Sequence, residues 1–309
     1  MIQTHNAQAE DRLFYGYRLR TDLLLPSLPS MSREGAEDIE LRVGDVPAQL
    51  SAATWRSPFV EIGADSDVLA RVGERIRFLI RDGRQVIINE APPSRITEIE
   101  TLLHGVVAGI LLHQRGDLAL HASCVVIGDR AVAIAGPGGR GKSTLAAVLV
   151  AQGYPLLTDD VCRVRFANGS AWAMPGSSRL RLWPDAARTL GHAPDTLAVG
   201  RPGHLKRQLP SSLVSTNPIR LGAILRLGVD SRQDTPSLVR LSGLATVIRS
   251  DEVLYRARLG RLLGRKVSLF EDLTRLLALV PMFSLTRTER SSDLSDMARL
   301  VISAASDDR

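Results

Sequence analysis

The chain has 309 residues, which is enough for two domains or for one large domain with an appendage. Hydrophobic residues make up 44% and charged residues 23%, as in ordinary soluble globular proteins, while aromatic residues are only 4%, too few to favour a surface that stacks single-stranded bases. The net charge of +6 and the pI near 9.9 suit an anionic ligand, but no block of five or six like charges occurs, which argues against nucleic-acid binding.

Cysteine usage and hydropathy indicate a cytoplasmic protein. The only two cysteines, Cys124 and Cys162, lie in apolar runs and are expected to be buried thiols rather than a disulfide framework. The first ten residues have no basic segment followed by an apolar one, so no signal peptide is expected. The apolar run 106–112 is far shorter than a membrane span, so no membrane association is predicted.

The first third of the chain predicts a mainly β N-terminal domain over residues 1–93. After a polar start that is expected to fray, short alternating apolar runs are separated by turn residues, a rhythm typical of strands. The expected strands are 14–19, 39–43, 76–80 and 85–89, and the Asp82-Gly83 pair between the last two predicts a hairpin.

From residue 94 to 309 the pattern changes to alternating strands and helices, which predicts an α/β domain. Ser94 can cap a helix over 95–113. Expected strands follow at 118–127, 130–135, 154–158, 162–166, 171–174, 219–227 and 282–286. Helices are expected after residue 142 and at 251–264, 268–279 and 291–305, with a turn and short helix at 177–189 and a loop-like stretch at 190–218.

A phosphate-binding loop connects two of these elements. The sequence GPGGRGKS at 136–143 fits the pattern G-x-x-x-x-G-K-[ST], follows an apolar strand and opens an apolar helix. The chain has 36 arginines but only three lysines, and one of those is Lys142, whose compact charge suits a phosphate cradle. The alternative is a glycine-rich turn that only resembles such a loop. The expected nucleotide-binding residues are Gly136, Gly138, Gly139, Arg140, Gly141, Lys142, Ser143 and Thr144.

Asp159 and Asp160 follow Lys142 by one helix and one strand, which places them at the carboxyl edge of the sheet where ligands bind. One carboxylate can hold Mg²⁺ beside Ser143, and the other can accept the proton of an attacking hydroxyl. Asp160 is the preferred base and Asp159 the preferred metal ligand, although the reverse order and two solvated carboxylates are both open. No N/T-K-x-D motif of GTPases follows Lys206 or Lys266.

His121 interrupts the apolar strand that precedes the loop. A single strand histidine is usually structural, so its role depends on what lies near it.

His121, the loop at 136–143 and Asp159-Asp160, in this order and spacing, resemble the catalytic domain of the HPr kinase/phosphorylase family. The resemblance covers about 100–190 and implies a P-loop kinase domain of the HPr kinase type that uses ATP and Mg²⁺. It implies that Lys142 and Ser143 bind phosphate and metal, that one aspartate is the base toward a serine hydroxyl, and that His121 lies close to the reacting phosphate.

The chain differs from the family at several positions. Thr144 stands where the family commonly has glutamate, the downstream Glu-x-Arg-Gly signature is absent, and 15–29 is unlike the usual N-terminal domain. The chain looks more like divergent HPr-kinase-like proteins of peptide-modification systems, including kinases that phosphorylate the C-terminal serine of lasso peptide precursors.

Four arginines are candidates for substrate binding. Arg179 and Arg181 would share one face of an extended segment near the site, where they could stabilise the transferred phosphoryl group or hold an acidic substrate. Arg258 and Arg261 would form, with Arg265, a basic ridge on a helix over 252–266. Solvated surface arginine is the alternative for both pairs, and a strand edge of the N-terminal domain is another peptide site.

These features together predict an ATP- and Mg²⁺-dependent serine kinase acting on a peptide or small protein. A true HPr kinase/phosphorylase and a nucleotide-gated regulator without catalysis are the alternatives. The sequence leaves open the identity of the substrate, the preference for ATP over GTP, and whether copies of the chain form a homo-oligomer.

Overall fold

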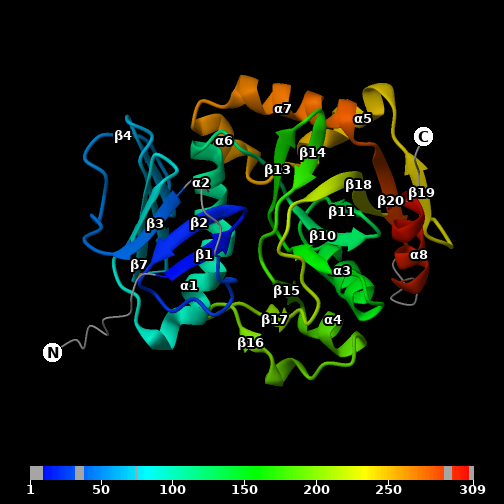
Figure 1. The fold of residues 1–309 in the computed structure, drawn as a ribbon, viewed down its shortest axis with the longest axis horizontal. Coiled ribbons are helices and arrows are strands. Elements are labelled where there is room, and N and C mark those ends of the chain that lie inside the picture. Colours follow the sequence, from blue (N-terminus) through cyan, green and yellow to red (C-terminus); the bar gives the residue numbers. More distant parts are fainter. Residues whose placement is uncertain (1–9, 32–37, 74, 289–293, 306–309) are drawn as a thin grey trace.

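The computed structural model describes residues 10–31, 38–73, 75–288 and 294–305, and it is a mixed α/β protein with two large sheets and a small third one (Figure 1). The first part of the chain forms an eight-stranded sheet in the order β1-β2-β3-β8-β7-β6-β5-β4, in which only β2–β3 and β3–β8 are parallel. Its strands are β1 (Glu10–Phe14), β2 (Tyr17–Thr21), β3 (Asp38–Val43), β4 (Ala53–Arg56), β5 (Val60–Gly63), β6 (Val68–Val72), β7 (Ile76–Arg81) and β8 (Gln85–Ile88).

The β-rich character of this region is confirmed, but individual strands differ from the prediction. The single strand expected at 14–19 is a hairpin, β1–β2, because Tyr15 and Gly16 adopt positive φ values of 52° and 81° and reverse the chain. Residues 10–12, expected to fray, belong to β1, while 1–9 lie outside the described residues. The Asp82-Gly83 hairpin is present between β7 and β8. Strands β4 to β6 were not predicted.

A long helix runs between the two large sheets. It comprises α1 (Ile96–Leu102), one π-helical turn (Leu103–Val107) and α2 (Ala108–Gln114), close to the predicted 95–113, and a short 3₁₀ turn precedes it. By length and composition these 19 residues could cross a membrane, with a mean hydropathy of 1.3. Their apolar side chains instead fill the core beneath the N-terminal sheet: Val107 and Ile110 are fully buried in one cluster with Phe78 of β7. The helix therefore packs on the N-terminal sheet, and the boundary expected after residue 93 stays a prediction.

The second large sheet has the order β12-β10-β11-β18-β14-β13-β9, with β20 beside β18 and β19 beside β20. Its three central strands β11, β18 and β20 are parallel. Alternate residues of β11 face opposite cores: Ala133 points to the layer of α7, and Ile134 points to the layer of α3 and α8. The strands are β9 (Leu118–Leu120), β10 (Ala122–Ile127), β11 (Arg130–Ala135), β12 (Leu156–Thr158), β13 (Cys162–Ala167), β14 (Ser170–Ala173), β18 (Ile219–Val229), β19 (Ser237–Arg240) and β20 (Met282–Arg287).

The helices around this sheet are α3 (Lys142–Ala151), α4 (Pro184–Thr189), α5 (Gly243–Ser250), α6 (Ala257–Leu262), α7 (Lys266–Leu279) and α8 (Leu294–Ala305), with 3₁₀ turns at Pro194–Thr196 and Asp251–Val253. The third sheet, β15 (Arg179–Leu182), β17 (Arg207–Pro210) and β16 (Ala198–Val199), falls in stretches expected to be turn and loop. Helix α5 and strand β19 were not predicted, and residues 291–293 of the expected last helix lie outside the described residues. Both cysteines are buried free thiols, as predicted.

Candidate functional site

The predicted strand, glycine loop and helix are present as β11, residues 136–141 and α3. Gly136 has a φ of 130°, and a Cβ there would lie 2.9 Å from the carbonyl oxygen of Leu227 in β18, so only glycine fits. Gly141, in the left-handed region at 99°, precedes the first turn of α3. The N–H groups of that turn have no partner within the helix, which makes the helix start a site for anions.

Lys142 begins the helix and points back into the loop. Its side chain is 7% exposed, and its Nζ donates to the carbonyl oxygens of Gly136 (2.8 Å) and Pro137 (3.1 Å). Burial lowers the pKa of Lys142 to about 8, although Asp160 and Asp159 act in the opposite direction. The lysine is therefore largely charged at neutral pH and held by carbonyls that phosphate oxygens can replace. The remaining predicted loop residues surround it: Gly138, Gly139 and Arg140 are exposed at the apex, and Ser143 and Thr144 are partly buried in the first turn of α3.

Asp159 faces the phosphate loop. It is 1% exposed, and its Oδ1 accepts hydrogen bonds from the hydroxyls of Ser143 (2.9 Å) and Ser123 (2.6 Å), while Oδ2 accepts from the backbone N–H of Arg181 (3.0 Å). Paired carboxylate and hydroxyl oxygens beside a phosphate-binding helix are suitable ligands for Mg²⁺, which keeps waters and takes phosphate oxygens as further ligands. In the described residues no group of three or more His, Cys, Asp or Glu side chains could enclose a metal by itself.

Asp160 has different partners from Asp159. Its φ of 71° lies in the left-handed region, which turns its side chain away from that of Asp159. It forms an ion pair with the guanidinium of Arg181, and its Oδ2 is 3.5 Å from the hydroxyl of Tyr255. Burial raises the pKa of Asp160, but Arg181, His121 and Lys206 outweigh burial and the net pKa is below the usual value. Asp160 is therefore ionised at neutral pH.

His121 joins Lys142 to Asp160. The predicted strand 118–127 is broken at this residue: β9 pairs with β13 whereas β10 pairs with β11 and β12. The Nδ1 atom lies 3.0 Å from the carbonyl oxygen of Asp160, and Nε2 lies 3.0 Å from the Nζ of Lys142. Burial is the main reason that the pKa of His121 is below its usual value. A neutral ring that donates from Nδ1 to the carbonyl accepts from the lysine at Nε2.

Two neighbours of the site were missed from the sequence. Ser123 is two residues after His121, and a polar residue that recurs within a buried strand was a usable signal. Tyr255 gave none, because it reaches the site from the segment before α6. Its hydroxyl donates to the carbonyl oxygen of Gly105 at 3.1 Å, within the π-helical turn, a feature often found at functional sites.

Of the first pair of candidate substrate arginines, only one reaches the carboxylates. Arg179 and Arg181 share one face of β15, as predicted. Arg181 pairs with Asp160, but Arg179 lies 3.2 Å from a carboxylate oxygen of Glu100 and 2.9 Å from the side-chain oxygen of Gln208, linking β15 to α1 and β17.

The predicted basic ridge does not form. Arg256, with a φ of 48°, interrupts the helix expected over 252–266, and α6 ends at Leu262. Arg265 is 9% exposed and donates to backbone carbonyls at the end of α2. Arg261 pairs with Asp251 at 3.2 Å, and Arg258 lies 6.0 Å from the ring centre of Trp55. Neither Arg258 nor Arg261 lines the two cavities of the site.

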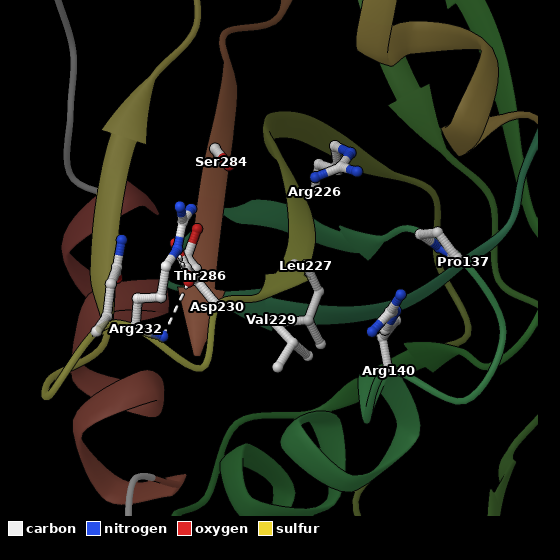
Figure 2. A pocket seen from close by; sticks show the side chains of 11 residues that line it. Pro137, Arg140, Arg226, Leu227, Val229, Asp230, Arg232, Ser284 and Thr286 are labelled. Atoms are coloured by element: carbon white, nitrogen blue, oxygen red, sulfur yellow. Dashed lines mark hydrogen bonds and ion pairs between the residues drawn. The ribbon is translucent and has the colours of Figure 1, made fainter. Parts of the chain in front are cut away.

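The two larger cavities near the loop share no lining residue. A cavity of about 350 Å³ is lined by Pro137 and Arg140 of the loop and by the carboxyl ends of β18 and β20. Figure 2 shows Arg140 and Arg232 on either side of Val229 in this cavity. A larger cleft of about 710 Å³ is lined by His121, Asp160 and Arg181 and by parts of the N-terminal sheet, and no residue of 136–143 lines it.

Comparison with known proteins finds a structural likeness but no match to a family model or a curated protein. Among solved structures, the HPr(Ser) kinase/phosphatase from Coxiella burnetii aligns with 59% of this chain and 93% of its own at 15% identity and a TM-score of 0.32. The likeness to a kinase/phosphatase is distant at this score, so function has to be inferred from the chain's own side chains.

Proposed function

We propose that the protein is an ATP- and Mg²⁺-dependent kinase that transfers the γ-phosphate to a serine hydroxyl of a peptide or small protein. One observation carries the proposal: two consecutive carboxylates have separate partners, one at the loop and one in the cleft. Asp159 meets Ser143 at the phosphate loop, and Asp160 meets His121 and Arg181 in the 710 Å³ cleft. A phosphoryl donor and a hydroxyl acceptor need such a division.

The phosphate loop would bind the donor. The β- and γ-phosphates lie against the N–H groups of α3, and the Nζ of Lys142 exchanges the carbonyls of Gly136 and Pro137 for phosphate oxygens. Ser143 and Asp159 would hold Mg²⁺, which would neutralise phosphate charge. The nucleoside extends into the 350 Å³ cavity, where the guanidinium groups of Arg140 and Arg232 offer flat, cationic contacts.

The acceptor would approach from the cleft. Asp160 orients the serine hydroxyl and accepts its proton while the hydroxyl oxygen bonds to the γ-phosphorus, and the bond to the bridging β–γ oxygen breaks to release ADP. Arg181, beside Asp160, stabilises the negative charge of the transferred group. His121 holds Lys142 and the backbone of Asp160 at a fixed separation, which keeps donor and acceptor in line.

The test uses the purified protein with [γ-³²P]ATP, Mg²⁺ and a mixture of serine peptides. Label should pass to serine, and the Asp160→Asn variant should bind ATP without transferring label. Normal ATP binding with neither hydrolysis nor transfer would contradict the kinase and support a nucleotide-gated regulator. Transfer confined to HPr would identify an HPr kinase.

A further inference from the structure

The large cleft of about 710 Å³ is lined by more positive than negative side chains, and a nucleotide bound at the loop would not neutralise this excess. Six Arg or Lys side chains line it, against the single carboxylate of Asp160. Arg181 pairs with Asp160, and Arg71 pairs with Glu61. The other four have no carboxylate partner in the part of the chain that the structure describes: Arg201, Lys206, Arg207 and Arg256.

Two of these four cations, Arg201 and Lys206, come from the segment that joins β16 to β17, and Arg207 is the first residue of β17. Gln208, which follows them, donates from Nε2 to the hydroxyl of Thr101 in α1 and thereby holds the segment against the long helix. Lys206 also contributes to the low pKa of Asp160 and to that of Lys142, so its charge acts on the reacting groups. The cations are thus arranged around the residue that would receive the acceptor hydroxyl.

The phosphates of a nucleotide would not neutralise these charges. They bind at the start of α3, and no residue of 136–143 lines the cleft. The four cations therefore face the acceptor side of the site.

The opposite wall of the cleft is apolar. Phe59, in the turn between β4 and β5, is 69% exposed, and Val60 and Val72 from the same sheet lie beside it. An exposed aromatic ring in the same cleft as cations that lack a carboxylate partner is suited to a partner that has both an apolar side chain and negative charge.

We propose that this cleft binds an acidic polypeptide segment, with carboxylates against Arg201, Lys206, Arg207 and Arg256 and an apolar side chain on Phe59. The inference rests on the proposed kinase function and adds the substrate class. The segment would cross from the N-terminal sheet to the β16–β17 segment and present its serine to Asp160. The N-terminal sheet contributes through Phe59 and the adjoining residues of β5 and β6, and no residue of the edge strand β4 lines the cleft.

A single-stranded nucleic acid fits the same cations less well. Base recognition without sequence preference needs aromatic side chains for stacking. The aromatic residues that line the cleft are Phe59 and Tyr255, and the hydroxyl of Tyr255 is bonded inward to Gly105. The observations therefore favour a peptide.

The experiment measures binding apart from catalysis. Three fluorescein-labelled peptide pools of equal length, each with a central serine and one leucine or phenylalanine, carry glutamate, glutamine or lysine at the other positions. Fluorescence anisotropy with full-length protein, ADP and Mg²⁺ should show the glutamate pool binding at least ~10-fold more tightly than the glutamine pool, since several exposed ion pairs of about 2- to 5-fold each contribute. Added salt should weaken this binding.

Substitutions of the cleft residues test whether the peptide binds there. Arg201→Glu with Lys206→Glu should weaken the glutamate pool on the order of 10-fold, and Phe59→Ser should weaken all pools that carry the apolar residue. The matched control is Arg299→Glu, on α8, whose side chain is 76% exposed and does not line the cleft. Far-ultraviolet circular dichroism and a thermal unfolding midpoint that match those of the unmodified protein show that the fold of each variant is intact.

The binding measurements separate the inference about the cleft from the kinase proposal. Equal affinity for the glutamate and glutamine pools, or no effect of the double reversal, overturns the inference while the kinase proposal stands. Tighter binding of a twelve-residue oligothymidine, lost in the double variant, also overturns it. Selective binding of the glutamate pool without phosphoryl transfer supports the cleft and counts against the kinase.

Discussion

Replacing each carboxylate of the pair separately tests the division of roles between Asp159 and Asp160. Asp160→Asn removes the proton acceptor from the cleft but leaves Ser143 and Asp159 in place, so we expect Mg-ATP affinity within about twofold of wild type. The single-turnover rate of transfer should fall by roughly 10²–10⁴, the usual contribution of a general base. This corresponds to about 3–5 kcal/mol of activation free energy.

The structural cost of this substitution can be measured separately from its kinetic effect. Asp160 and its partner Arg181 have side chains 16% and 29% exposed, so water screens part of their attraction. Loss of the pair leaves Arg181 largely buried without its carboxylate and should lower the free energy of unfolding by about 2–3 kcal/mol. A folded variant with a rate reduced a hundredfold or more would therefore have lost chemistry, and thermal unfolding followed by circular dichroism measures the structural part.

Asp159→Asn is the matched variant, because it makes the same chemical change one residue away. It replaces a charged metal ligand beside Ser143 with a neutral one, so the Mg²⁺ concentration at half-maximal rate should rise on the order of tenfold, and high Mg²⁺ should restore part of the rate. Mg²⁺ should not rescue Asp160→Asn. The reasoning would be refuted by a single-turnover rate of Asp160→Asn within threefold of wild type, or by the same Mg²⁺ dependence in both variants.

Four further predictions concern the phosphate loop and the two arginines of the predicted basic ridge. Lys142→Ala should weaken ATP binding and abolish transfer, and calorimetry with unchanged affinity would contradict the loop assignment. Because the pKa of Lys142 is about 8 and the cation exists below it, the affinity of the free protein for ADP should hold up to about pH 7 and fall as the pH rises past 8; the Lys142→Ala variant should lack this dependence. Gly136→Ala should lose nucleotide binding, because the new methyl group meets the carbonyl oxygen of Leu227 at 2.9 Å; a normal ADP titration would show that the loop tolerates the strain. Charge reversal at Arg258 and Arg261 should leave the peptide KM unchanged, and a rise in KM would return peptide docking to α6.

The phosphate loop was predictable because everything that specifies it is contiguous. A strand, a set of glycines, a lysine and a helix follow one another within about twenty residues, and each is recognisable from local chemistry. The hairpin at Asp82-Gly83 was predictable for the same reason. Where the determinants lie on neighbouring residues, a single sequence carries the information.

The acceptor side was not predictable, because distant segments build it. The cleft combines a turn of the N-terminal sheet, the π-helical turn, the segment before β17 and the residues Tyr255 and Arg256. No periodicity connects these pieces. The opposite error occurred at 252–266, where helical spacing suggested a basic ridge: the left-handed backbone at Arg256 divides the segment, and Arg265 turns inward to satisfy the carbonyls that end α2.

For Asp159 and Asp160, the sequence could not predict which carboxylate faces the loop and which faces the cleft. In a regular strand two consecutive side chains point to opposite faces of the sheet, and either could have faced α3. Strand β12 ends at Thr158, so the pair lies beyond the last strand residue, where the backbone is free to leave the pleat. The positive φ of Asp160 then directs one carboxylate to the cleft while three hydrogen bonds hold the other at the phosphate loop. Under the proposed function, the backbone conformation of this one residue therefore decides which aspartate would hold the metal and which would meet the hydroxyl.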